Sequence, residues 1–171
     1  SETPPGRFLR DPFVMKSNYI SYATHASWQW EVRSAVERSR PYAEHFLKGL
    51  VHVTGEDDAE IAFVTCGTAS HQAKEAHREL MKLGIKSKVI KLRTIRPFPK
   101  KELIAALDGV KNIFVPEFNV VGWLEKEVKT ALHNNHSADV VGGPRVAGGM
   151  SMPAEAIIQE VMEKINPVKG A

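Results

Sequence analysis

Residues 66–70, with the sequence CGTAS, combine small side chains with a position between a short apolar run and a predicted helix. Exposed backbone N–H groups at the start of a helix can bind an anion such as a phosphate group. However, the chain contains neither G-x-G-x-x-G nor G-x-x-x-x-G-K-S/T, so the sequence does not indicate a nucleotide site. We therefore interpret this segment as a tight turn in which Thr68 caps the following helix.

Cys66 is the single cysteine of the chain, so an internal disulfide is excluded. A nucleophilic thiol needs a neighbouring base, and no histidine lies at a recognised motif spacing from it. We expect Cys66 to be a packing residue at the end of a buried strand. A lone cysteine fits a reducing compartment, and we expect the protein to be cytoplasmic.

The seven histidines do not form a metal-binding pattern. His133 and His136 lie three residues apart where a helix should end, and His71 and His77 face different sides of one helix. Cysteines and carboxylates at zinc spacing are also missing. We predict no metal site, no cofactor site and no catalytic set in this chain.

Two other polar segments are better placed for function. Glu117 and Asn119 follow the third apolar run, although capping of the next helix explains them equally well. Residues 142–150, GGPRVAGGM, contain four glycines and an arginine but lack the lysine of a P-loop. Glycine permits close backbone approach, so we interpret this segment as a contact loop.

Residues 86–99, KSKVIKLRTIRPFP, have an apolar centre long enough for a buried strand and too short for a packed helix. Two prolines lock the end of this stretch, because proline fixes φ and restricts the residue before it. The stretch therefore predicts a strand that ends in a rigid, cationic turn. In an open α/β sheet, ligands and partners bind at that end of the strands.

The stretch belongs to a basic run. Residues 82–101 contain eight lysines and arginines and no acidic residue, while the net charge of the whole chain is only +3. The run forms either a solvated rim and turn or a docking surface for an acidic partner or phosphate. Nucleic acid is not favoured, because aromatic stacking residues and a basic helix are missing.

Short apolar runs alternate with helical patterns from residue 59 onward, which predicts a three-layer α/β/α fold with a mainly parallel sheet. Strands are expected at 60–66, in the 86–99 stretch, at 112–115 and at 138–141. One helix should end near residue 83, a second near 108, a third should follow residue 119, and a fourth should start near 153. The first and third are expected to bury, respectively, Ala69, Ala73, Ala76, Leu80 and Leu83, and Val121, Leu124, Val128 and Leu132.

The beginning of the chain differs in pattern. Residues 1–27 are predicted to form an arm or linker, and residues 28–171 the α/β domain, which begins with a helix over 28–50 interrupted at Pro41. Phe13, Tyr19 and Tyr22 favour an arm that lies on a partner surface. We expect no secretory peptide and no membrane span, because no run reaches about 18–20 apolar residues.

Several short motifs follow one another along the chain. They are AEIAFVT-x-GT at 59–68, GIK at 84–86, LR-x-x-RPFP at 92–99, L-x-GVK at 107–111 and VPE-x-N-x-x-G at 115–122. In this order and spacing the chain resembles, over residues 31–165, the transketolase C-terminal-like domain of 2-oxoacid:ferredoxin oxidoreductases. It is most similar to the alpha-type subunit of the pyruvate-type enzymes, the pyruvate synthases.

The resemblance implies a hetero-oligomeric oxidoreductase that decarboxylates a 2-oxoacid on thiamine diphosphate. Iron–sulfur clusters then pass electrons to ferredoxin, and coenzyme A takes the acyl group. In that family the thiamine diphosphate, Mg²⁺ and clusters are bound by other domains or subunits, so this chain is expected to be a non-catalytic assembly domain, inactive alone. The resemblance implies that the face toward the other subunits includes Arg93, Arg96, Phe98, Asn119 and Gly122.

Two other classes of protein fit the sequence. One is a stand-alone flavodoxin-like module that binds phosphate or flavin at the Gly67-Thr68 turn. The other is an adaptor that docks an acidic electron carrier on residues 82–101. The sequence does not define the 2-oxoacid or the oligomeric state.

Overall fold

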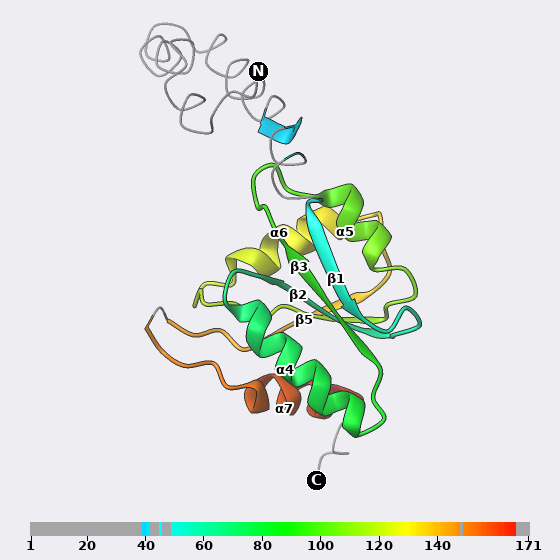
Figure 1. Ribbon diagram of the computed structural model, residues 1–171, viewed down its shortest axis with the longest axis vertical. Coiled ribbons are helices and arrows are strands. Elements are labelled where there is room, and N and C mark those ends of the chain that lie inside the picture. The colour runs from blue at the N-terminus through cyan, green and yellow to red at the C-terminus, as the bar shows by residue number, and fades with distance from the viewer. Residues whose placement is uncertain (1–38, 42–44, 46–48, 148, 167–171) are drawn as a thin grey trace, which may run out of the picture. The chain divides into compact units, whose positions relative to one another are not determined.

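The computed structural model describes residues 39–41, 45, 49–147 and 149–166. The chain divides into two compact units, Ser1–Phe46 and Leu47–Ala171, and the second contains the α/β fold (Figure 1). The arm predicted for 1–27 and most of the helix predicted for 28–50 lie outside the described residues.

A five-stranded sheet with the strand order β1-β3-β2-β4-β5 forms the centre of the second unit. β2, β3, β4 and β5 pair in parallel, and β1 pairs antiparallel with β3. The elements in chain order are β1 (Val51–Gly55), β2 (Ile61–Cys66), α4 (Ala69–Lys82), β3 (Ser87–Leu92), α5 (Lys100–Ala106), β4 (Asn112–Phe114), α6 (Trp123–Leu132), β5 (Asp139–Gly142) and α7 (Ala154–Ile165).

Helices cover both faces of the sheet, so the predicted three-layer arrangement is confirmed (Figure 1). Successive residues of a strand point to opposite faces. In β2, Ala62 and Val64 pack in the cluster that includes residues of α5 and α6, and Ile61 and Phe63 pack in the cluster with α4 and α7. All four are buried, which explains why β2 is a continuous apolar run.

Two predicted core positions are wrong. Leu83 is 62% exposed because α4 ends at Lys82, and Gly84, with a φ of +78°, turns the chain away. Val121 is 60% exposed because α6 begins only at Trp123. Both residues fit the helical spacing but lie just outside the helix that would have buried them.

The first strand, β1, was not predicted, and the helix predicted to reach residue 50 does not do so. Gly49 has a φ of +101°, and Gly49 and Leu50 form a bend that leads into β1. Leu50 is only 2% exposed, so its position in the apolar stripe reflects burial in the sheet domain rather than a helix. Among the described residues, no helix is long and apolar enough to cross a membrane.

Candidate functional site

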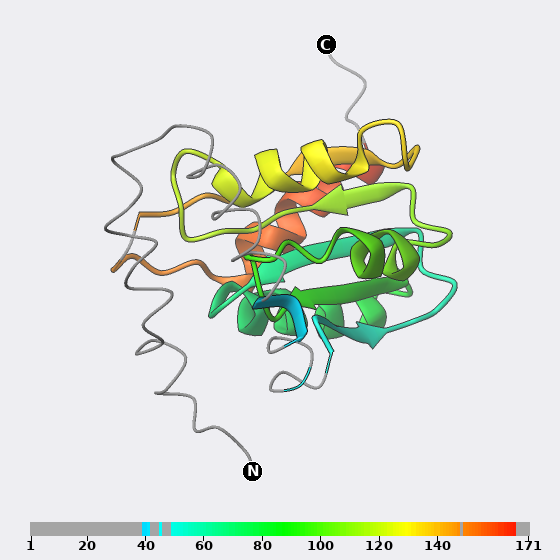
Figure 2. The same cartoon turned by 90° about the horizontal axis from the view of Figure 1, so that it is seen from above.

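The parallel strands end at one edge of the sheet, here called the carboxyl edge, and begin at the opposite, amino edge. The β4–α6 and β5–α7 loops extend together from the carboxyl edge (Figure 2). The chain passes from β2 to β3 on one side and later to β4 on the other, so the strand order reverses between β2 and β4. Ligands and partners of open α/β sheets bind at such a reversal.

The Arg-Pro-Phe-Pro turn between β3 and α5 is fixed to α6 through Arg96. The guanidinium of Arg96 donates to the Ile95 carbonyl at 2.7 Å and pairs with the Glu127 carboxylate at 3.0 Å. It also lies over the Trp123 ring, 5.2 Å from the centroid, where a cation–π attraction adds to the ion pair. These contacts with Glu127 and Trp123 attach the turn to α6. The Arg96–Pro97 peptide is cis.

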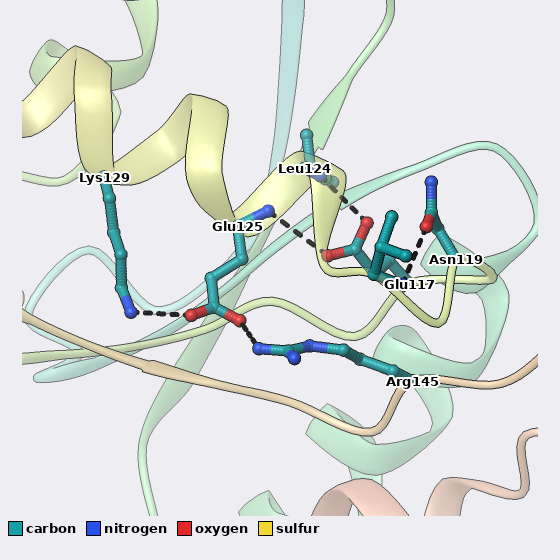
Figure 3. A network of polar contacts seen from close by, with 7 residues as sticks. Glu117, Asn119, Leu124, Glu125, Lys129 and Arg145 are labelled. Carbon is teal, nitrogen blue, oxygen red and sulfur yellow. Dashed lines mark hydrogen bonds and ion pairs between the residues drawn. The ribbon is translucent and has the colours of Figure 1, made fainter.

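Glu117, just after β4, caps α6 with its side chain (Figure 3). It is 4% exposed, and its carboxylate accepts hydrogen bonds from the backbone N–H groups of Leu124, at 2.9 Å, and Glu125, at 3.2 Å. These N–H groups have no partner within a helix, and the helix dipole favours a negative charge there. The Gly122 residue at the N-cap has no side chain to supply this bond, so Glu117 replaces a local cap.

Glu125 joins α6 to the β5–α7 loop (Figure 3). Its carboxylate is buried and pairs with Lys129 at 2.6 Å and with Arg145. Burial alone would raise the pKa of the Glu125 carboxyl, but hydrogen bonds from Lys129 and Arg145, and their charges, lower it overall. The carboxylate is therefore ionised at neutral pH and holds both cations.

Two glycines allow the loops to approach this closely. A Cβ on Gly122, which has a φ of +66°, would lie 2.8 Å from the guanidinium carbon of Arg145. A Cβ on Gly143 would lie 2.7 Å from the backbone of Val115 and Pro116. A parallel bridge between Glu117 and Arg145 extends the β4–β5 pairing beyond the strands. Residues of α6 thus contact the β3–α5, β4–α6 and β5–α7 loops.

A family model described as pyruvate:ferredoxin oxidoreductase core domain II matches residues 59–157. The chain belongs to this family. Residues 59–157 contain β2 to β5 and the start of α7, with the carboxyl-edge network between them. The resemblance inferred from the motifs is therefore confirmed.

Similarity to a relative and to solved structures was also found. The chain is 33% identical, over 74% of its length, to ketoisovalerate oxidoreductase subunit VorA from Pyrococcus abyssi, and spans 32% of that relative. It is similar in fold to 2-oxoglutarate:ferredoxin oxidoreductase from Magnetococcus marinus, with a TM-score of 0.63, 21% identity, and coverage of 84% of this chain and 24% of that one. A split gene transketolase is also similar in fold, with a TM-score of 0.56 and 21% identity. This similarity covers 66% of this chain and 40% of the transketolase chain.

The five predicted interface residues all follow β3 or β4 at the carboxyl edge of core domain II. Arg93 donates its backbone N–H to the Leu50 carbonyl at 2.9 Å, and Phe98 packs partly against the core. Asn119 accepts a hydrogen bond from the Val121 N–H through its side chain, at 3.0 Å. These three residues therefore have defined contacts within the fold, and the role of all five in an interface stays a prediction.

The sequence prediction missed Glu125 and Arg145 as a pair. They lie 20 residues apart, on different elements, and only the β4–α6–β5 crossover brings them together. The sequence prediction includes Arg145, within the glycine-rich loop, but does not identify the buried acidic residue with which it pairs. The sequence signal was Glu125 itself, an acidic residue that directly follows Trp123 and Leu124 in the first turn of α6.

Gly67 and Thr68 form the predicted turn between β2 and α4, but Thr68 does not cap α4. Thr68 is at the N-cap position without a side-chain hydrogen bond, because its backbone is already helical. Ser70 instead donates to the Gly67 carbonyl at 2.6 Å. Burial, reinforced by the charge of Glu117, raises the pKa of the Cys66 thiol, so it is protonated at neutral pH and poorly nucleophilic.

The basic run does not form a single docking surface, because its cations lie before, on and after β3 and so at both ends of this strand. Lys86 pairs with Asp58 at the amino edge, whereas Arg96 lies at the carboxyl edge. Lys88 is 4% exposed and donates to the Asp108 carbonyl at 3.0 Å. An acidic electron carrier therefore cannot contact the run as a whole.

The histidines that are described have local structural contacts or are exposed. His136 faces the Leu107 carbonyl at 3.0 Å and accepts from the Ala138 N–H at 3.0 Å, which ties α5 to β5. His77 contacts the Ser87 hydroxyl at 2.9 Å. Within the described ranges, no group of three or more histidine, cysteine or acidic side chains could hold a metal ion.

Proposed function

We propose that this chain is a non-catalytic assembly domain of a thiamine-diphosphate-dependent 2-oxoacid:ferredoxin oxidoreductase. The match of residues 59–157 to core domain II carries this proposal. The whole enzyme would oxidatively decarboxylate a 2-oxoacid such as pyruvate to acyl-CoA and pass the electrons to ferredoxin. The chain would work in the cytoplasm, within a hetero-oligomer.

The donor groups of this chain do not fit the cofactors of such an enzyme. An iron–sulfur cluster is commonly held by about four cysteine thiolates, and the whole chain has one cysteine. The diphosphate of thiamine diphosphate is bound through Mg²⁺, which prefers carboxylate oxygens, and the buried carboxylates of Glu117 and Glu125 are engaged with α6, Lys129 and Arg145. We therefore assign thiamine diphosphate, Mg²⁺ and the clusters to other domains or subunits.

The choice of 2-oxoacid would also lie outside this chain. The family description names pyruvate, whereas the similar VorA subunit is named for ketoisovalerate. A domain shared by enzymes for different 2-oxoacids is suited to assembly rather than to substrate selection.

The carboxyl edge would be the face toward the rest of the enzyme, through Arg93, Arg96, Phe98, Asn119 and Gly122. The rigid network beneath this edge supports the proposal, because a preordered surface loses little conformational entropy on binding. Residues 1–27 would form an arm on a neighbouring surface, and residues 28–171 the domain itself.

Co-purification of the tagged chain from its native cells tests this function. The expected result is recovery of subunits that contain thiamine diphosphate and iron–sulfur clusters and that reduce ferredoxin when given a 2-oxoacid. The isolated chain should neither bind thiamine diphosphate, as measured by calorimetry, nor release CO₂ from 2-oxoacids. A chain purified alone with bound flavin or nucleotide would refute the proposal.

A further inference from the structure

Residues 119–122 form a tight turn with two exposed valines at its tip. The Gly122 N–H donates to the Asn119 carbonyl at 3.2 Å, which closes a four-residue β-turn. Val120 and Val121 occupy the two central positions and are 61% and 60% exposed. Central positions of β-turns usually hold Pro, Gly, Asn, Asp or Ser, because these residues satisfy the backbone geometry without exposing apolar surface. Two valines there give the turn an apolar tip.

The base of the turn is held from both sides. The Asn119 side chain accepts from the Val121 N–H at 3.0 Å, within the turn itself. Gly122 lies against the guanidinium of Arg145, and Glu117 caps the helix that follows. The valines are therefore presented in a fixed position, and their exposure does not result from a loose loop.

Other exposed apolar residues lie at the same edge. The described residues include six large apolar side chains that are exposed, and four of them follow the carboxyl ends of β3, β4 or β5: Ile95, Val120, Val121 and Met150. Most of these exposed large apolar side chains thus lie in the loops that follow the parallel strands, which favours a protein contact at this edge.

Cations flank this apolar surface. Arg96 is 55% exposed in the turn that carries Ile95, and Lys100 and Lys101 are exposed at the start of α5. Neither lysine makes an ion pair with another described residue. The carboxylate nearest to the valines in sequence, Glu117, is buried. A complementary surface would therefore combine an apolar depression with carboxylates around it.

We propose that Val120 and Val121 insert into an apolar, carboxylate-rimmed depression on another subunit of the same oxidoreductase. This proposal rests on the assembly function proposed above and identifies the main anchor of that assembly. Two apolar side chains buried at the centre of a contact and surrounded by charged residues are a common arrangement of binding hot spots.

The test measures the affinity of the full chain for the remaining subunits, purified without it from the assembled enzyme. We expect the V120S/V121S variant to bind about 100-fold more weakly, because two anchoring side chains lose their apolar contact. The matched controls V53S, on β1, and L83S, after α4, change valine and leucine side chains that are 40% and 62% exposed and should bind like the wild type. The K100E/K101E variant should bind more weakly at low salt and show a smaller salt dependence. All variants should keep the urea midpoint of the wild type.

The outcomes separate the two proposals. If the wild-type chain recovers no thiamine-diphosphate subunit, the proposed function fails. If the wild type assembles and V120S/V121S binds equally well, only the anchor fails. A photo-crosslinking residue at position 120 should label another subunit at a site with apolar and acidic residues. Labelling of a second copy of this chain, or of residues 1–48 of the same chain, would overturn the anchor.

Discussion

The two edges of the sheet use charged residues in different ways. At the carboxyl edge, Glu117 and Glu125 are 4% and 6% exposed, and each is hydrogen-bonded to a specific partner on another element. At the amino edge, the ion pair of Lys111 with Glu60 has side chains that are 66% and 60% exposed. Both edges therefore contain ion pairs, but of these pairs only those of Glu125 at the carboxyl edge have a buried carboxylate.

This difference determines what each edge contributes. A buried carboxylate loses its hydration and is retained only when hydrogen bonds and opposite charges compensate, so the partners must be placed accurately. An exposed pair contributes about 0–1 kcal/mol and tolerates rearrangement. The positions of the side chains are consequently fixed at the carboxyl edge. At the amino edge the ion pairs mainly supply surface charge, and their side chains can rearrange.

The largest difference in stability between the two edges should follow from replacing one glycine by alanine at each edge. We expect Gly143→Ala to lower the free energy of unfolding by about 3 kcal/mol, because its Cβ meets the backbone of Val115 and Pro116. Gly109→Ala, at the amino edge, should cost only about 1 kcal/mol, for its φ of +75° and not for any contact. Urea unfolding of both variants measures this, and equal losses would contradict the comparison.

Removal of a carboxylate should give the next effect. Glu117→Ala leaves two N–H groups of α6 without a partner, and we expect a loss of about 2 kcal/mol. Glu117→Gln keeps one acceptor and should recover part of this stability. Glu60→Ala, the amino-edge control, should change stability by less than about 0.5 kcal/mol. A Glu117→Ala variant as stable as Glu60→Ala would show that the cap is unimportant.

Arg145→Gln should show the contribution of the Glu125 pair through its pH dependence. The folded-state pKa of Glu125 lies below its ordinary 4.5, so the pair stabilises the protein above pH 4.5, and this stabilisation is lost as the pH falls through the folded pKa. We expect Arg145→Gln to cost about 1–2 kcal/mol at pH 7, because Lys129 still pairs with Glu125, and progressively less below pH 4.5. A loss that is constant with pH would indicate packing alone.

His77 should produce a smaller, pH-dependent effect near the amino edge. Burial lowers the pKa of His77 from 6.5, so the unfolded chain binds more protons than the folded one just below that pH. Stability should therefore decrease as the pH falls from 6.5, and His77→Gln should flatten this decrease. Thermal unfolding of both proteins between pH 7.5 and 5 measures this pH dependence. The ionic strength is held at about 0.1 M so that screening does not change.

The smallest effect is expected for Lys86→Gln, which removes the exposed pair with Asp58. The hydrogen bond from Lys86 lowers the pKa of the Asp58 carboxyl, but both side chains are more than half exposed. We expect no measurable change in the urea midpoint. A clear destabilisation would show that the amino edge also depends on specific pairing.

Four of the five strands, the main helices and the layers could be predicted because β2, β3 and β4 each have an apolar centre and the helices each have one apolar stripe. β1 was missed because the predicted helix extends to residue 50, directly before this five-residue strand, whose pairing with β3 the sequence does not reveal. The Arg145–Glu125 pair depends on a crossover connection, which spacing along the chain does not reveal. Lys88 belongs to a basic run but lies on β3, which is buried between its neighbours β1 and β2, and this central position rather than its charge determines its burial.

The two outer strands of the sheet limit how this domain can associate. β1 has five residues, and β5 has four, with an irregular register where it pairs with β4. Short and irregular outer strands provide few aligned N–H and C=O groups for a strand of another chain. Growth of the sheet from one molecule into the next is thereby disfavoured, and contacts between chains are directed to side chains on loops, where recognition can be specific and reversible.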